Sequence, residues 1–255
     1  MAEKIKKIFW LVLVGAIFIA IWQGGLIHEA LGFKPFQLPT PLQILETLST
    51  NMSKALSDTF VTVSGALTGL LIGSLIGFGV AVIATMFPKW GYPGLSIISA
   101  FNAIPIVALS PIMNRWFEKG FGQKVGVVTI VCMAAMAINA YRGLTNLKPF
   151  ALDLMDSYAA SKKAIFFKLR FPNCLPSIFT ALKINIASAL MAAMISEYFA
   201  ASTAGLGFGI KDNLRKGMMS MGWSYIVMAS IAGIVLYLII SLVERRALHW
   251  HTSQR

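Results

Sequence analysis

The stretch FVTVSGALTGLLIGSLIGFGVAVIATMF, residues 60–87, contains no charged side chain. A transmembrane helix needs about 20 mostly apolar residues, and this run exceeds that length. Gly65, Gly69, Gly73 and Gly77 recur within it every four residues, so they share one face of a helix. Such a stripe lets a second helix approach closely. Packing within the chain is favoured over a seam between two copies, although the sequence alone does not separate the two.

Five other apolar runs predict further spans, which gives an all-α fold: a polytopic bundle of six transmembrane helices. The span at 184–200 is the weakest of these, because Lys183 has to snorkel to the headgroups and Glu197 has to lie at the outer boundary or face the bundle interior. The predicted spans are residues 8–27, 60–87, 91–114, 125–141, 184–200 and 218–243.

The composition agrees with residence in a membrane. Hydrophobic residues make up 57% of the 255 and charged residues only 13%, which leaves too little polar surface for a soluble domain. The length suits one transmembrane domain, residues 1–255, rather than two domains. The apolar run at 8–27 resembles a signal peptide, but no small-residue cleavage site follows it, so an uncleaved anchor is favoured.

The net charge of +12 is best explained by membrane topology. With six spans and both termini inside, 14 of the 22 Lys and Arg fall on inner segments and 8 on outer ones. Cytoplasmic loops are enriched in Lys and Arg, so we expect a protein of the bacterial cytoplasmic (inner) membrane with cytoplasmic termini. No basic surface interleaved with aromatic residues indicates nucleic-acid binding.

Several candidate disulfide, metal-binding and phosphate-binding motifs lack the residue spacing that such sites require. Cys132 and Cys174 are not expected to face each other and have no metal-ligand spacing, which argues against a disulfide framework. His249 and His251 have no third ligand for a metal. Residues 205–209, GLGFG, lack the spacing of a phosphate-binding loop and predict a turn after the fifth span. The chain is therefore not expected to be an enzyme or its own ATPase.

A short amphipathic helix is predicted on the outer side, between the first two spans. Pro39 and Pro41 flank Thr40, a favourable capping residue, and leucines then follow at 42, 45 and 48. The helix would lie on the membrane surface or meet a partner.

The loop at 142–183 is basic, too long for a tight turn, and predicted to be cytoplasmic. Asp153 and Asp156 come early and Lys162 and Lys163 late, which suits the dipole of a short docking helix. Ile165, Phe166 and Phe167 are predicted to form an exposed apolar group outside the membrane, and such a group needs a partner to cover it. The predicted contact residues are Asp153, Asp156, Ser157, Tyr158, Ala159, Ala160, Ser161, Lys162, Lys163, Ile165, Phe166 and Phe167.

This loop resembles the EAA loop of ABC-importer permeases. Asp153 takes the place of the family's acidic residue, residues 159–161 take that of its Gly-Ala-Ser-like triplet, and Phe171-Pro172 and Leu175-Pro176 take those of its two Leu-Pro pairs. The departures are Asp for Glu, Ala for Gly at 159 and Phe for Leu at 171. Pro172 and Pro176 are predicted to end the docking helix.

The resemblance extends over nearly the whole chain and looks closest to the nitrate, sulfonate, taurine and thiamine-precursor branch. The sequences of residues 157–161 and 244–251 look most like those of family members linked to pyrimidine thiamine precursors or riboflavin. Further matching stretches are Leu38-Pro39-Thr40-Pro41, Ile104-Pro105 to Pro111, Trp116-Phe117, Gly120-Phe-Gly122, Asn139 to Leu144, Glu197-Tyr198-Phe199 and Gly205-Leu206-Gly207.

The resemblance implies a type I importer permease fold and a set of partners. These are a second permease subunit, expected to be an identical copy, two separate ATP-binding subunits and an extracytoplasmic solute-binding protein. The chain would hold no cofactor, since ATP-Mg would bind to the partner ATPase subunits. The segment from Asp153 to Phe167 would act as a coupling helix inserted in an ATPase groove.

Polar residues in or beside the spans are candidates for lining a solute path, although hydrogen bonding between helices explains each Asn at least as well. The alternative function is an ATP-independent secondary transporter or channel, which would need charged residues within the spans or an internal repeat. The predicted path residues are Asn102, Pro105, Asn139, Asn185 and Glu197.

Overall fold

The computed structural model describes residues 2–34, 36–117, 120–199 and 202–249, and within these ranges the chain forms helices and no strands. The all-α prediction is therefore confirmed. The predictions that concern His251 and the end of the stretch 244–251 lie outside the described residues, as does Arg255, one of the 14 basic residues counted on inner segments. The first elements are α1 Ala2–Gln23, α2 Leu26–Leu31, α3 Pro41–Thr50, α4 Met52–Met86, α5 Pro88–Ala100, the 3₁₀ turn η1 Phe101–Ala103 and α6 Ile106–Trp116. The others are α7 Phe121–Thr145, α8 Ala151–Ser157, α9 Lys162–Ile165, the π-helical turn η2 Phe166–Arg170, α10 Phe171–Phe199, α11 Leu206–Arg215 and α12 Met219–Ala247.

Four helical stretches in the described part are long and apolar enough to cross a membrane, or up to five if the bent pair α5–α6 is one span. Helix α1 contributes only a shorter apolar stretch, Val12–Gln23. The count of six spans therefore stays a prediction. The four long stretches are Met52–Met86, Phe121–Thr145, Lys162–Phe199 and Met219–Ala247.

The predicted first span, 8–27, is not one continuous helix. Helix α1 ends at Gln23, and α2 begins after Gly25, whose φ of 83° lies in the left-handed region that favours glycine. The two glycines at 24 and 25 thus separate the apolar run into two helices.

The predicted third span, 91–114, is also wrong as a single helix. Helices α5 and α6 meet at a bend of 100°. Pro105 has no N–H, and it holds Ile104 in an extended conformation with ψ of 121°, so the helix stops before it and α6 starts anew. Pro93 and Pro111, by contrast, lie inside helices.

Helix α10 starts well before the predicted boundary at 184, so Pro172 and Pro176 do not end the preceding helix. Pro172 follows the π-helical turn within one continuous helical stretch, Lys162–Phe199, and Pro176 lies inside α10. The π-helical turn Phe166–Arg170 precedes it directly and changes the register of the backbone hydrogen bonds.

The glycine stripe of α4 packs against α7 of the same chain, which confirms the favoured interpretation. A Cβ added to Gly73 would lie 2.5 Å from the carbonyl oxygen of Thr129, and one added to Gly69 would lie 2.5 Å from Cβ of Val128. The two backbones are therefore too close for any side chain at these positions. Buried residues of α6, α7 and α10 continue this core: Leu109, Met113, Val127, Cys132, Ile186 and Leu190.

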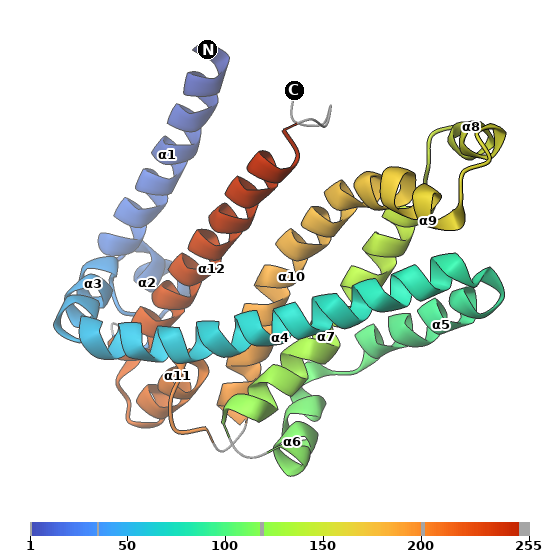
Figure 1. The fold of residues 1–255 in the computed structure, drawn as a ribbon. Coiled ribbons are helices and arrows are strands. Elements are labelled where there is room, and N and C mark those ends of the chain that lie inside the picture. Colours follow the sequence, from blue (N-terminus) through green and yellow to red (C-terminus); the bar gives the residue numbers. More distant parts are fainter. Residues whose placement is uncertain (1, 35, 118–119, 200–201, 250–255) are drawn as a thin grey trace.

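Figure 1 shows that the helical bundle has two ends. The start of α1, the end of α12 and the α8–α9 region lie toward the top of the view, whereas α3, α6 and α11 lie in its lower half. The long helices α7, α10 and α12 connect the two ends.

Candidate functional site

The predicted docking helix from Asp153 to Phe167 is in fact two short helices, α8 and α9, joined by a turn. Ala159 in that turn has a φ of 49°, in the left-handed region, which interrupts the helix. Ser161 then starts α9, where its Oγ accepts a hydrogen bond from the backbone N–H of Ala164 at 3.3 Å. We call residues 150–167 the coupling segment.

Large apolar side chains project from the coupling segment. Phe150 is 80% exposed, Leu154 57%, Tyr158 77% and Phe167 67%. Phe150 and Leu154 were not among the predicted contact residues. Their spacing of four residues, which places two apolar side chains on one side of a helical turn, is a signal that could have identified them. Apolar groups of this size gathered outside the spans indicate a surface that a partner covers.

Two residues predicted as exposed contacts are partly buried instead. Ile165 and Phe166 are half-buried, and the ring of Phe166 lies 5.1 Å from that of Phe167 and 6.3 Å from that of Phe171. The π-helical turn that begins at Phe166 directs this ring back toward α10 and the core around Met136 and Leu144.

The residues that directly follow the coupling segment form hydrogen bonds with the end of α7. Nη1 of Arg170 donates to the carbonyl oxygen of Leu144 at 2.8 Å, and Nδ2 of Asn173 donates to those of Gly143 and Asn146 at 2.8 and 3.0 Å. These bonds satisfy carbonyls that the end of a helix leaves free. The turn and the start of α10 that follow the coupling segment are therefore bonded directly to the end of α7.

A group of polar side chains is buried at the opposite end of the bundle, and we call it the buried clamp. Glu197 of α10 has no exposed surface, and its carboxylate forms an ion pair with Lys124 of α7. Nζ of Lys124 also donates to the carbonyl oxygen of Val61 at 2.8 Å. The clamp consists of Asp58, Thr62, Lys124, Glu197 and Tyr225.

The clamp holds the backbone between α10 and α11. The N–H of Gly207 donates to Oε2 of Glu197 at 2.9 Å, and that of Leu206 donates to Oγ1 of Thr62 at 2.8 Å. Thr62 in turn donates to Oε2 of Glu197 at 2.9 Å. These contacts join α4, α10 and α11.

The fifth member of the clamp brings in α12. The N–H of Gly205 donates to Oδ1 of Asp58 at 3.0 Å, and the hydroxyl of Tyr225 donates to Oδ2 at 2.6 Å. Gly205, with a φ of 109°, makes the turn, and the rest of the predicted turn at 205–209 is the start of α11. The turn prediction thus holds only for its first residue.

Lys124 directly precedes the predicted span at 125–141 and is one of the 8 basic residues counted on outer segments, but it is only 2% exposed. The charge of this buried ammonium is compensated by the carboxylate of Glu197 and by the carbonyl oxygen of Val61. Its neighbour Gln123, also buried, donates from Nε2 to Oγ of Ser110 and of Ser196, each at 3.1 Å. The sequence signal for this region was the need of Glu197, in an apolar helix, for a cationic partner.

The predicted path residues do not form one surface. Asn102 and Pro105 are exposed at the bend between α5 and α6, while Asn139 is half-buried and donates to the carbonyl oxygen of Ala135 at 2.8 Å. Asn185 is 1% exposed and donates to the carbonyl oxygen of Cys132 at 2.9 Å, and Glu197 is fully buried. Within this chain, Asn185 and Glu197 act as bonds between helices and offer no surface to a solute.

The predicted short outer helix is present as α3. Thr40 and Gln43 form a capping box, and Ile44 and Leu48 are buried, with Leu48 in a cluster that includes Tyr225. The helix therefore packs on α12 of its own chain. Leu42 and Leu45 stay exposed.

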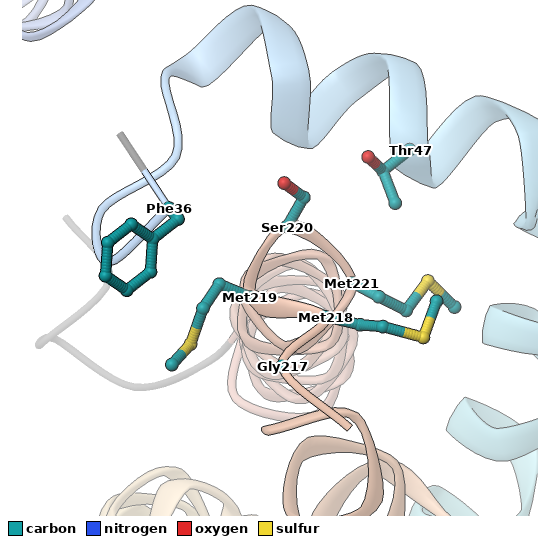
Figure 2. Close-up of a pocket in the computed structure, with 7 residues that line it drawn as sticks. All are labelled: Phe36, Thr47, Gly217, Met218, Met219, Ser220 and Met221. Atoms are coloured by element: carbon teal, nitrogen blue, oxygen red, sulfur yellow. The ribbon is translucent and has the colours of Figure 1, made fainter. Parts of the chain in front are cut away.

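A shallow pocket of about 320 Å³ opens beside α3, at the start of α12 (Figure 2). Met219 extends toward Phe36, whereas Met218 and Met221 lie together on the other side of the helix. Methionine side chains make an adaptable apolar lining, and the pocket offers no charged group. In the described residues, no group of three His, Cys, Asp or Glu is placed to hold a metal ion.

Comparison with known proteins gives a consistent result. The formylaminopyrimidine transport permease protein ThiX of Halalkalibacterium halodurans is 27% identical over 228 residues, which is 87% of this chain and 88% of that protein. The riboflavin transport system permease protein RibX of Chloroflexus aurantiacus is 26% identical over 242 residues, covering 93% and 88%. The taurine transport system permease protein TauC of Escherichia coli is 24% identical, covering 92% and 87%.

Solved structures share the fold. A chain of the inward-facing MetNI methionine ABC transporter superposes with a TM-score of 0.68 at 16% identity, covering 77% of this chain and 97% of that one. A chain of a bacterial ABC transporter involved in alginate import gives 0.64 at 12% identity, covering 96% and 98%. Nothing among these proteins supports the ATP-independent alternative. Residues 69–249 match a single family over most of the chain, so the protein belongs to the binding-protein-dependent transport system inner membrane components and is a multi-pass permease subunit of an ABC importer, not an enzyme.

Proposed function

We propose that two copies of this chain form the translocation path for a small solute that an extracytoplasmic binding protein delivers, and that two separate ATP-binding subunits drive transport. The names of the relatives support a solute such as a pyrimidine thiamine precursor, a riboflavin-like heterocycle, or a sulfonate, taurine or nitrate. ATP-Mg would bind to the ATPase subunits, and this chain would need no cofactor of its own.

The exposed apolar surface of the coupling segment is the observation that carries the proposal. Leu154 and Tyr158 project from a segment outside the long helices, in a loop that is otherwise basic. Such a surface is stable only when a partner covers it. The ATPase subunit is the partner that the similar ABC-transporter structures suggest.

The attachments of the segment supply a route for mechanical coupling. When ATP closes the ATPase subunits, α8 and α9 move with them. Arg170 and Asn173 pass that movement to the end of α7, and α9 passes it through the turn at 166–170 into α10. The bundle then changes between inward-open and outward-open states, which both ATP and the loaded binding protein bias.

Two observations support cytoplasmic termini. The start of α1, the end of α12 and α8 lie at the same end of the molecule in Figure 1. The segments assigned to that end carry the larger share of Lys and Arg. Reactivity of single cysteines, introduced at Lys6 and at Ser157, toward a membrane-impermeant maleimide in intact cells would test this orientation: both should be protected.

A pull-down of the detergent-solubilised chain with its ATPase tests the coupling proposal. Tyr158→Ser and Leu154→Ser should each weaken capture by about 30-fold or more, as expected for central contact residues. Phe36→Ser is the matched control and should leave capture unchanged. Phe36 is a 64% exposed aromatic residue beside the start of α12, away from the coupling segment (Figure 2). Retention of the ATPase by both coupling variants would refute the proposal.

The solute class needs a separate measurement. Cells that express the complete transporter should accumulate one of the labelled candidates, formylaminopyrimidine, riboflavin, taurine or nitrate, in an ATP-dependent way. If the cells take up none of these solutes, the proposed solute class is wrong, but the proposed contact between the coupling segment and the ATPase is unaffected.

A further inference from the structure

A cleft of about 420 Å³ lies between the end of α4 and the coupling segment, and we call it the α4–α9 cleft. One wall comes from the last turn of α4 and the first residue of α5, the other from α8, α9 and the π-helical turn. In Figure 1 these elements face one another at the right of the view. The lining residues are Thr85, Met86, Phe87, Pro88, Leu152, Lys162, Ile165, Phe166 and Arg170.

The lining combines an apolar wall with two cations. Arg170 is half-buried, and its Nη1 donates to the carbonyl oxygen of Leu144, which orients the guanidinium. Among the described residues this group has no other hydrogen bond, so its other N–H donors can bind a ligand. Lys162 is exposed on α9. Neither cation forms an ion pair with any carboxylate in the part of the chain that the structure describes.

Other charged residues near the cleft do not neutralise the positive charge of Lys162 and Arg170. Lys89 follows Pro88 directly and is exposed, as is Lys163 beside Lys162. Asp153 and Asp156 are exposed on α8 and do not line the cleft. The surroundings of the cleft are therefore positive.

The position of the cleft narrows the choice of ligand. The apolar run of α4 ends at Met86, so the cleft lies where a spanning helix leaves the hydrocarbon for the headgroup region. A soluble anion would gain nothing from Met86, Phe87 and Ile165, and a neutral lipid would not need two unpaired cations. We propose that the α4–α9 cleft binds one anionic phospholipid, with its phosphate on Lys162 and Arg170 and an acyl chain along the apolar wall.

Such a lipid would connect the turn between α4 and α5 to the coupling segment. This places a bilayer component next to the element that is proposed to meet the ATPase, so the headgroup composition of the membrane could influence that element. The lipid site itself depends only on the cleft and on residence in a membrane, and it does not rest on the coupling proposal.

Photolabelling of the full-length chain in lipid nanodiscs tests the site. The probe is phosphatidylglycerol with a diazirine on one acyl chain, in a phosphatidylcholine background, and mass spectrometry locates the adducts. We expect adducts on Met86, Phe87 or Ile165, and about fivefold less labelling in Lys162→Gln, the change that loss of one basic residue near an anionic surface predicts. Lys54→Gln, an exposed lysine at the other end of α4, is the matched control and should label as wild type.

A second variant tests the apolar wall without changing charge. Leu152→Trp should fill part of the cleft and reduce the acyl-chain adducts, while size-exclusion profiles verify that each variant is folded. Equal labelling of Lys162→Gln and Lys54→Gln, or equal labelling by a phosphatidylcholine probe, would overturn the proposal.

Two further arms separate a lipid from other occupants. Glycerol 3-phosphate added at millimolar concentration should not displace the adducts; displacement would show a site for soluble phosphates instead. Addition of the ATPase subunit should leave the adducts in place, and their loss would assign the cleft to the protein interface and overturn the proposal.

Discussion

The buried clamp and the coupling segment use their polar and apolar residues in opposite ways. The clamp gathers five polar side chains from α4, α7, α10 and α12, none of them more than 8% exposed, and pairs them with one another and with backbone groups. The coupling segment instead leaves Phe150, Leu154 and Tyr158 largely exposed. In this protein, paired polar groups in the interior stabilise the fold, whereas exposed apolar groups offer a contact surface to a partner.

The largest effect is expected from breaking the central pair of the clamp. Lys124→Met leaves the carboxylate of Glu197 buried without its cation, which should lower the free energy of unfolding by about 3–5 kcal/mol. Thermal unfolding of the purified chain in detergent measures this loss. Tyr158→Ser in the coupling segment, by contrast, should unfold at the wild-type temperature.

A double variant distinguishes loss of the charge pair from loss of packing. Lys124→Met combined with Glu197→Gln removes both charges, so much of the stability should return, since a neutral pair of similar volume can replace a buried ion pair. A double variant no more stable than Lys124→Met alone would mean that the pair itself is not what stabilises this end of the bundle.

The next effect concerns the close contact of α4 with α7. A Cβ on Gly73 would meet the carbonyl oxygen of Thr129, a backbone atom that cannot move aside, so Gly73→Ala should cost about 1–3 kcal/mol. Gly79 lies on the same helix with nothing within 4 Å of an added Cβ. Gly79→Ala should therefore be neutral or stabilise by up to about 1 kcal/mol through helix propensity. Equal unfolding temperatures for the two variants would contradict the packing argument.

A smaller effect is expected at the edge of the clamp. Tyr225→Phe removes the hydroxyl that donates to Oδ2 of Asp58, and the partly unpaired carboxylate should lower stability by about 1–3 kcal/mol. Tyr237→Phe on the same helix is the control, because that side chain is 46% exposed. The same unfolding measurement applies, and a loss in the control as large as in Tyr225→Phe would mean that removal of any tyrosine hydroxyl from α12 has this effect, and that the bond to Asp58 is not its cause.

Local patterns in the sequence predicted the helical class, the glycine stripe and the place of the coupling segment. Apolar length, a period of four residues and a motif within one loop are each visible in a short stretch. The pairing of Lys124 with Glu197 was missed because it joins residues far apart in the chain, and Lys124 directly precedes an apolar run in a region that resembles a loop. The bend before Pro105 was missed because Pro93 and Pro111, equally visible in the sequence, do not break their helices.

The smallest effect lies in the turn of the coupling segment. Ala159 holds a left-handed conformation that costs an L-residue about 1–2 kcal/mol, and glycine adopts it without that cost but loses about 0.5–1 kcal/mol of chain entropy on folding. Ala159→Gly should thus stabilise the turn slightly, whereas Ala160→Gly, next to it without a positive φ, should loosen it. Hydrogen exchange over residues 150–165 measures this local change, which global unfolding would hide. Faster exchange in both variants alike would mean that the left-handed φ of Ala159 does not strain the turn, and that this turn, unlike the clamp, has no residue whose local conformation decides its stability.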